Sequence, residues 1–242
     1  MSRKGMRVIF GSLLVVGVLA LAACGTGSGA GAKTTPTATP GAAQIVAHIK
    51  NLQFKDATFT MTFNFTTQGQ TVSGSGGGKF TKNPDRSDIQ LAFPLTVSGS
   101  TYNLQYEVIT DGTTSYTMIT SNPDIPGVST GGMWTKGTTD SSSSSSPFGN
   151  TSQFGDFATG LGSPTLVGTE TVNGVATYHL KGTDTSTAGS SIDLYVRTDN
   201  YQPVKADFTE TGSSSGNFTL VFTGFNSGIS IATPPASQVT GS

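Results

Sequence analysis

Large apolar residues alternate with polar ones along most of the chain, and this period-two pattern is the feature that most limits its fold. The first row places Phe59, Met61, Phe63 and Phe65 between threonines and an asparagine. Such alternation is typical of a β-strand with one face in a core and the other in water. Comparable rows follow at residues 89–97, 104–108, 116–118, 178–180, 192–196, 204–208 and 218–222.

Turn-forming residues stand between these rows. Asn-Gly and Asp-Gly pairs between alternating segments are strong marks of β-hairpins. The pattern therefore predicts an antiparallel, mostly meandering sheet of about ten strands. The turn signals are Gln68-Gly69, Asn83-Pro84-Asp85, Asp111-Gly112, Asn173-Gly174, Asp199-Asn200 and residues 212–216.

Two segments have helical rather than strand spacing. Residues 42–52 place Ile45, Val46, Ile49 and Leu52 on one helical face. Residues 151–161 also have helical spacing, although two glycines in this segment weaken a helix. The apolar positions of this second segment are Phe154, Phe157, Ala158 and Leu161.

The predicted helices are too few to cover the predicted sheet. Ten strands spaced about 4.8 Å apart make a sheet nearly 50 Å wide, whereas one helix covers roughly 10–12 Å. An uncovered apolar face of that size is a liability in water. The sheet could fold into a sandwich, close into a small barrel, or curl part-way around a cavity that an apolar ligand or the helices occupy.

The N-terminus predicts export and lipid anchoring. Basic residues precede an apolar run at 8–22, which is shorter than the roughly 20 residues needed to span a bilayer, and Leu21-Ala22-Ala23-Cys24 ends it. These last four residues resemble the lipobox of bacterial lipoproteins. We expect residues 1–23 to be a signal peptide and Cys24 to carry acyl chains such as palmitate. The protein would then be anchored to the extracytoplasmic face of the cell membrane.

Composition divides the rest of the chain. Residues 24–43 are rich in Gly, Thr and Pro and predict a flexible tether. Residues 44–235 form the predicted domain, a serine-rich stretch at 138–150 is expected to be a flexible loop within it, and residues 236–242 are expected to be a disordered tail.

The charges of the chain nearly cancel, with 13 basic and 14 acidic residues. No net positive potential is therefore expected that would attract nucleic acid. With one cysteine, no disulfide can form within the chain.

The C-terminal half resembles a known group. The hairpin at residues 167–182, the segment 192–196 followed by Gln202-Pro203-Val204-Lys205, and the ending at 222–235 with Pro234-Pro235 are similar to the LppX/LprG-type lipoproteins, part of the LolA/LolB-like superfamily. The order of lipobox, tether, short helix and meander also agrees. Two features depart from the pattern. One is the serine-rich insertion, and the other is Arg197-Thr198, which stands where an acid commonly follows the strand.

This resemblance implies a mostly β (α+β) fold, a curved antiparallel half-barrel with one or two helices packed in its mouth. It implies an apolar cavity that holds acyl chains, and a carrier of lipid or lipoprotein across the bacterial cell envelope. We expect the protein to be a monomer. The implied partners are an acyl lipid or glycolipid, the membrane through Cys24, and a membrane transporter. An envelope sensor of the same fold and a passive surface module are the alternatives.

Inward-facing residues of the strands are the candidates for lining such a cavity. They are Phe59, Met61, Phe63, Phe65, Leu91, Phe93, Leu104, Tyr106, Leu194, Phe208, Leu220 and Phe222. Ordinary core packing is the competing interpretation for each of them. Trp134 is interpreted as a strand anchor rather than a rim residue.

Catalytic and metal-binding motifs are not found, and we expect neither an enzyme nor a cofactor. His48 lies in the first predicted helix, and His179 is expected to face outward from a strand. Neither has the spacing of a metal-binding helix, and no G-x-S-x-G motif presents a serine. The glycines at 74–78 indicate a bulged or bent strand. The acids Glu107, Asp193 and Asp207 are expected on polar strand faces.

Overall fold

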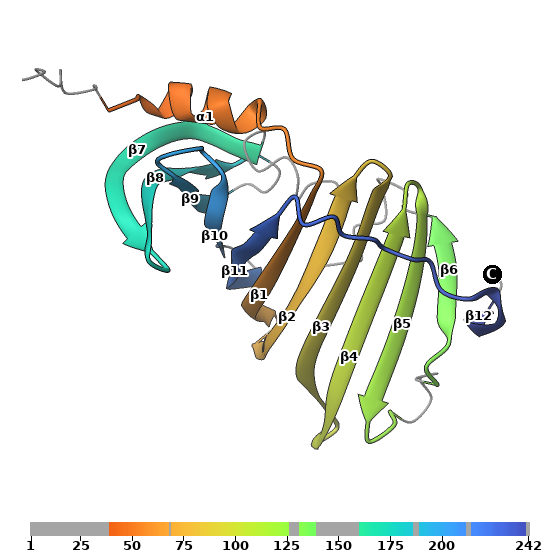
Figure 1. Cartoon of the computed structure of the whole chain (residues 1–242). Coiled ribbons are helices and arrows are strands. Elements are labelled where there is room, and N and C mark those ends of the chain that lie inside the picture. Colours follow the sequence, from red (N-terminus) through yellow and green to blue (C-terminus); the bar gives the residue numbers. More distant parts are fainter. Residues whose placement is uncertain are drawn as a thin grey trace, which may run out of the picture. The chain divides into compact units, whose positions relative to one another are not determined.

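The computed structural model describes residues 39–67, 69–125, 131–138, 160–185, 189–211 and 214–240. Within them, one α-helix precedes a large sheet (Figure 1). The helix is α1 (Ala42–Lys50), and a 3-10 turn, η2 (Ala236–Gln238), lies near the C-terminus. The strands are β1 (Asp56–Thr67), β2 (Gln70–Lys82), β3 (Asp85–Val97), β4 (Ser100–Asp111), β5 (Thr114–Asn122), β6 (Trp134–Thr138), β7 (Leu161–Val172), β8 (Val175–Asp184), β9 (Ser191–Arg197), β10 (Pro203–Glu210), β11 (Ser214–Phe225) and β12 (Val239–Thr240).

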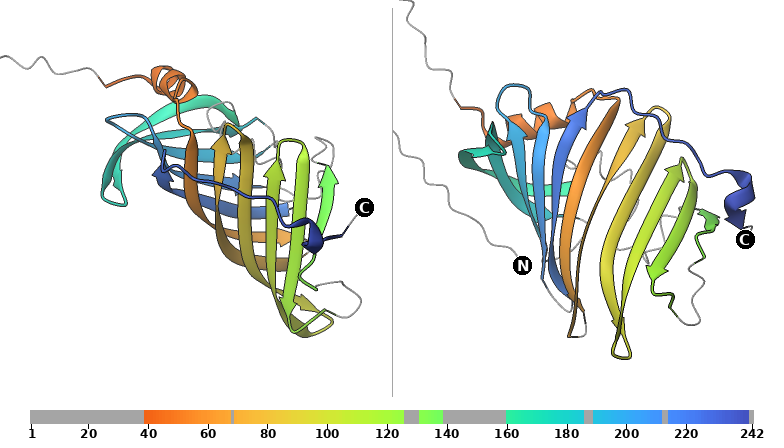
Figure 2. Two further views of the ribbon diagram at one scale, coloured as in Figure 1. Left: turned by 45° about the vertical axis from the view of Figure 1, so that its right-hand side comes forward. Right: turned by 60° about the horizontal axis from the view of Figure 1, so that its bottom comes forward.

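The strands form one open sheet in the order β12-β6-β5-β4-β3-β2-β1-β11-β10-β9-β8-β7. Neighbours are antiparallel except for β12, which pairs with β6 in parallel. The sheet curves strongly and is not closed (Figures 1 and 2). The predicted mostly β half-barrel is therefore confirmed, and the sandwich and the closed barrel are not what the chain forms. The described strands number twelve. Four of them, β2, β6, β7 and β12, have no row of large apolar residues that would reveal them in the sequence.

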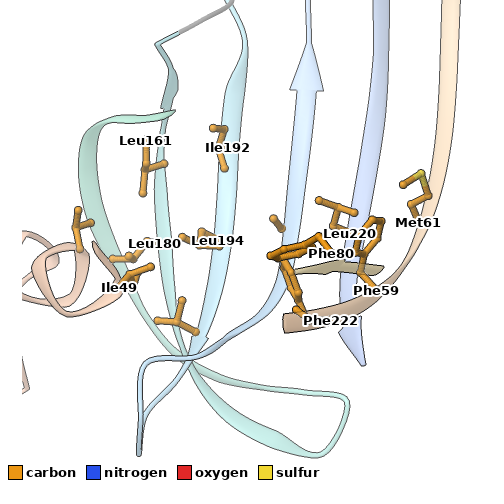
Figure 3. Packing of buried hydrophobic residues seen from close by; sticks show 14 of the residues in the cluster. Ile49, Phe59, Met61, Phe80, Leu161, Leu180, Ile192, Leu194, Leu220 and Phe222 are labelled. Carbon is orange, nitrogen blue, oxygen red and sulfur yellow. The ribbon is translucent and has the colours of Figure 1, made fainter. Parts of the chain in front are cut away.

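One hydrophobic core lies on the side of the sheet that also receives α1, and we call this side the inner face. Ile45, Val46 and Ile49 of the helix are buried in the same cluster as residues of β1, β3, β8, β9 and β11. Figure 3 shows Ile49 beside Leu180, with Leu161 and Leu194 close by. The first predicted helix is thus confirmed, and its apolar stripe fixes it against the sheet.

The glycines of β2 allow the inner side chains of neighbouring strands to pack across that strand. Gly78 is paired with Phe59 on one side and Ile89 on the other. The ring of Phe59 and the side chain of Ile89 occupy the space that a side chain at 78 would fill. The register of β2 with both neighbours is unbroken. Of the two predicted alternatives at 74–78, a bulged or a bent strand, the bulge is therefore excluded and the bent strand agrees with the curved sheet. Glycine is needed here for close packing rather than for an extra residue in the strand.

A second, smaller cluster lies on the outer face near the far edge of the sheet. It contains Ile109, Trp134 and Ile231, with Tyr116 and Met118 packed against it. The apolar row of β5 therefore faces outward, because Tyr116 pairs with Ile109 whereas Thr117 pairs with Val108 of the inner face. Alternation alone could not show which face of the sheet each row would join.

The C-terminal residues correct one expectation. Residues 236–240, predicted to belong to a disordered tail, form η2 and the edge strand β12. Leu161, the last position of the second predicted helix, begins β7 instead, and residues 151–159 of that helix lie outside the described residues. Thr138 ends β6, and the remainder of the serine-rich stretch, the signal peptide and the tether to residue 38 also lie outside them.

The other end of the sheet is irregular. Strand β7 shifts register against β8 between Gly162 and Thr165 and again between Leu166 and Gly168. Ser163 has a left-handed backbone, with φ of 47°, and Pro164 cannot donate a backbone hydrogen bond. These features bend β7 and interrupt its regular edge.

Candidate functional site

All twelve candidate lining residues lie on the inner face, as their register requires. Phe59 is opposite Phe222, and Met61 is opposite Leu220. Tyr106 and Leu91 are paired across β3 and β4. The structure therefore brings together residues separated by up to 163 positions in the chain, from Phe59 to Phe222.

Seven of the twelve are part of the packed core. Leu194 and Leu220 have no exposed surface, and Met61 exposes 2 %. The core members among the candidates are Phe59, Met61, Phe63, Leu91, Leu194, Leu220 and Phe222. Their burial by other residues of the chain is what core packing requires, so we assign them to stability.

Five candidates remain partly exposed on the inner face: Phe65, Phe93, Leu104, Tyr106 and Phe208. Five more half-buried apolar residues share this face by register and were not named as candidates. They are Val72 opposite Phe65, Leu95 opposite Tyr102, Val108 opposite Ile89, Ile119 opposite Tyr106, and Phe218 opposite Phe208. We call these ten residues the open apolar surface.

Aromatic rings form much of the open apolar surface. The ring centroids of Phe63 and Phe93 are 6.0 Å apart in an edge-on arrangement. Phe65 stacks on Phe63, also at 6.0 Å, and Phe208 lies 5.6 Å from Phe218. Such contacts hold large side chains in place without fully burying them, so part of each ring stays available to a ligand.

The central rows of the inner face of β1 to β5 carry no charge. Their positions 59–65, 72–80, 87–97, 102–110 and 115–121, taken alternately, hold only apolar residues, glycine, serine and threonine. Lys82 at the end of β2 and Asp85 at the start of β3 continue the inner rows at the rim of the sheet. The other charged residues of these strands lie on the outer face, where Lys79 pairs with Asp88 at 3.3 Å. An uncharged, partly exposed concave surface is suited to an apolar ligand.

The outer face of β7 to β10 holds a polar network around His179. Its Nδ1 lies 2.8 Å from Oε1 of Glu170, and its Nε2 lies 2.7 Å from Oδ1 of Asp193. Tyr195 stacks on the imidazole at 4.5 Å. Burial, followed by the charges of Asp207, Glu170 and Asp193, raises the pKa of Tyr195 to about 12.

This network links three neighbouring strands on the outer face. Carboxylates of β7 and β9 flank the two ring nitrogens of His179 on β8. His179, Asp193 and Asp207 point away from the core, as predicted, while His48 is exposed on α1 and stacks on Tyr201 at 4.2 Å. Across the described residues, no group of three or more His, Cys, Asp or Glu side chains is placed to hold a metal ion.

Trp134 anchors its strand, as the sequence predicts. It exposes 7 % of its surface and packs against Ile109 and Ile231 on the outer face. It does not take part in the open apolar surface.

No helix in the part of the chain that the structure describes has the length and apolarity to cross a bilayer.

Comparison with known proteins gives structural likeness only. No family model matches the chain, and no curated protein matches it significantly. The lipoprotein LppX of Mycobacterium tuberculosis is similar over 78 % of this chain and 99 % of its own, with 12 % identity and a TM-score of 0.45. LprF of Mycobacterium bovis is similar over 80 % and 96 %, with 15 % identity and a TM-score of 0.45.

A LolA-superfamily protein of Nitrosomonas europaea is also similar, over 82 % of this chain and 97 % of its own, with 11 % identity and a TM-score of 0.32. The predicted likeness to LppX-type and LolA-like proteins is therefore found, and it concerns the fold. It assigns no ligand to this chain.

Proposed function

We propose that the open apolar surface binds the acyl chains of a lipid, and that the protein is a membrane-anchored carrier of lipid or lipoprotein in the bacterial envelope. The observation that supports this proposal is the uncharged central part of the inner face of β1 to β5, where eight large apolar side chains stay partly exposed, with Phe208 and Phe218 on β10 and β11 completing the surface. A surface of this kind on a protein in water is typical of a binding site. The ligand would be an acyl lipid or a glycolipid.

Methylene burial would supply the binding energy. Each buried methylene contributes about 0.8 kcal/mol, so one long acyl chain gains on the order of 10 kcal/mol before the entropic cost of association. No catalytic group is needed. Shape, an apolar lining and access from solvent are sufficient.

The N-terminal features would supply the location. A lipidated Cys24 would hold the protein, as a monomer, on the extracytoplasmic face of the cell membrane. The tether of about 19 residues would reach roughly 25 Å root-mean-square. The domain would thus work close to the bilayer and to a membrane transporter that gives or takes its ligand.

Paired substitutions on opposite faces of one strand test the site. Phe93→Asp places a charge on the open apolar surface, whereas Ala92→Asp places the same charge on the exposed outer face of β3. Burying an unpaired carboxylate is costly, so uptake of a fluorescent fatty acid should fall at least about tenfold in Phe93→Asp and stay unchanged in Ala92→Asp. Equal uptake by both folded variants would exclude this surface as the site.

Leu104→Asp and Gln105→Asp form a second matched pair on β4, with Leu104 inward and Gln105 outward. Substitution of Leu220 or Phe63 would be a poor test, because both are buried in the core and a charge there would unfold the domain. Mass spectrometry of lipids that co-purify with the parent protein would name the ligand. Transfer between donor and acceptor vesicles would distinguish a carrier from a lipid sensor.

A further inference from the structure

The chain after β11 crosses the outer face of the sheet. Strands β1, β2, β3, β4 and β5 lie between β11 and β6 in the sheet order, yet residues 226–240 run from the end of β11 to the edge of β6. Figures 1 and 2 show this segment in dark blue, passing the same end of the intervening strands in every view. We call residues 226–240 the C-terminal strap.

The first anchor of the strap is at the start of β1. Both carboxylate oxygens of Asp56 accept backbone hydrogen bonds, from Ser227 at 2.7 Å and Gly228 at 3.1 Å. Asn226 accepts a bond from the backbone N–H of Lys55 at 2.7 Å. Asp56 is 4 % exposed, so these are protected bonds of a charged acceptor, which are stronger than neutral ones.

The middle anchor is at Arg86 of β3. Its Nε and Nη2 donate to the two carboxylate oxygens of Asp111 on β4, at 2.9 and 3.1 Å. Its Nη1 donates to the carbonyl oxygen of Ile231 at 2.9 Å. The Ile231 side chain is buried between Ile109 of β4 and Trp134 of β6. One guanidinium thus joins the strap to two adjacent strands.

The last anchor is at the edge of the sheet. Val239 and Thr240 pair with Trp134 and Thr135 of β6, and the Thr240 hydroxyl donates to the Trp134 carbonyl at 3.0 Å. Strand β6 is short, with five residues, and without β12 it would be an edge strand with one neighbour at that end. Edge strands with few partners open most easily.

The three anchors tie the C-terminal strap to β1, to the pair β3 and β4, and to β6. The strap thus connects strands that are not neighbours, whereas the sheet connects each strand only to the next one. We propose that the C-terminal strap is a brace that fixes the curvature of β2 to β6, and through it the access to the open apolar surface on the opposite face. This inference rests on the proposed function for its ligand. The brace lies entirely on the outer face, so it can control access without contacting lipid.

Arg86→Met tests the brace. Methionine keeps an unbranched apolar stem but donates no hydrogen bond, so the middle anchor is lost. A fluorescent fatty acid should be released faster by a factor of about five, as expected for loss of the hydrogen bond from Arg86 to Ile231, which is the one that joins the strap to the sheet here. Amide hydrogen exchange should rise in β5 and β6 and stay unchanged in β1 and β11. The measurements use the full mature chain with Cys24→Ala, which avoids lipid-anchored aggregates.

Arg197→Met is the matched control. Arg197 makes the same two-pronged contact with Asp199, at 2.9 and 2.8 Å, in the β9–β10 turn away from the strap. It should leave probe release and β5–β6 exchange unchanged. If Arg86→Met does not fold, a chain that ends after Pro235 removes η2 and β12 and should give the same two changes.

The outcomes separate the two proposals. Faster exchange in β5 and β6 with unchanged probe release would overturn the brace as a control of access. Unchanged exchange would overturn it as a brace. If the parent protein takes up no fatty acid, the proposed function fails, and the exchange data alone still decide whether the strap holds the sheet.

Discussion

Gly78 shows how one residue without a side chain lets a curved sheet fill its own interior. A Cβ at this position would lie 2.6 Å from the carbonyl oxygen of Asp88 and 2.7 Å from Cζ of Phe59. Both distances are far below van der Waals contact. The ring of Phe59 therefore takes the volume above β2, and the core is continuous from β1 to β3.

Gly78→Ala should destabilise the domain. Forcing a methyl group into this packed site costs about 1–3 kcal/mol, which corresponds to a fall in Tm of several degrees for a domain of this size. Thermal unfolding followed by circular dichroism measures it. Gly131→Ala is the control, because a Cβ there meets nothing within 4 Å. An equal Tm for both variants would contradict the packing role of Gly78.

Glu107 is a residue whose charge opposes folding. Burial, together with nearby Asp88, raises its pKa above the ordinary 4.5, and a hydrogen bond from Gln90 offsets this in part. The folded state therefore favours protonated Glu107. The stability that this group contributes is present below its ordinary pKa and is lost as the pH rises through the raised value.

Glu107→Gln should consequently raise the Tm at pH 7, and its advantage over the parent protein should shrink toward pH 4. The amide can also donate a hydrogen bond toward Asp88, whose Oδ1 is buried with no partner among the described residues. Unfolding curves at several pH values test this. A Tm gain that is the same at pH 4 and pH 7 would show that the charge of Glu107 is not the cause.

Helix α1 is held to the sheet by an element that lies far away in the sequence. Its Ile45, Val46 and Ile49 enter the core, and exposed His48 stacks on Tyr201 of the β9–β10 turn. Tyr201 in turn stacks on Tyr178 of β8, with ring centroids 6.1 Å apart. The apolar stripe of α1 could be predicted from spacing, but the ring stack depends on a turn about 150 residues later and could not.

Tyr201→Leu should loosen α1 selectively. Loss of the aromatic stack removes about 0.5–1.5 kcal/mol, so the backbone amides of Ile45, Val46 and Ile49 should exchange with solvent several-fold faster. Tyr195→Leu is the control, since Tyr195 is on the outer face beside His179. It should lower global stability without a selective change at α1. Equal exchange at α1 in both variants would contradict the docking role of Tyr201.

At the scale of the whole molecule, the strands and most turns could be predicted from alternation, because a half-buried strand must alternate. The glycines at 74–78 indicated a bent strand, but the side chains that pack across them could not be predicted, because they are set by the register of β2 with its neighbours. The alternation also predicted which residues face inward, but not which of them are buried. Leu104 and Leu194 both stand in alternating rows, yet Leu194 is fully buried and Leu104 is partly exposed. The C-terminal strap could not be predicted, because its strand β12 has two residues and is too short to show alternation.

Cys24→Ala should separate location from binding. If Cys24 carries the anchor, the variant should leave the membrane fraction and appear in the soluble fraction of the envelope or in the medium. Uptake of fatty acid by the purified variant should be unchanged, because the open apolar surface lies within residues 65–218. Fractionation with immunoblotting measures the first effect. A variant that stays with the membrane would refute the lipid anchor.

The two ends of the open sheet also differ in how they would meet another molecule of the same protein. At one end, the irregular β7 with Pro164 offers a poor template for a further strand. At the other end, two residues of β12 shield part of β6. Proteolytic removal of β12 would uncover that margin of β6, so fibrils and loss during storage should begin there.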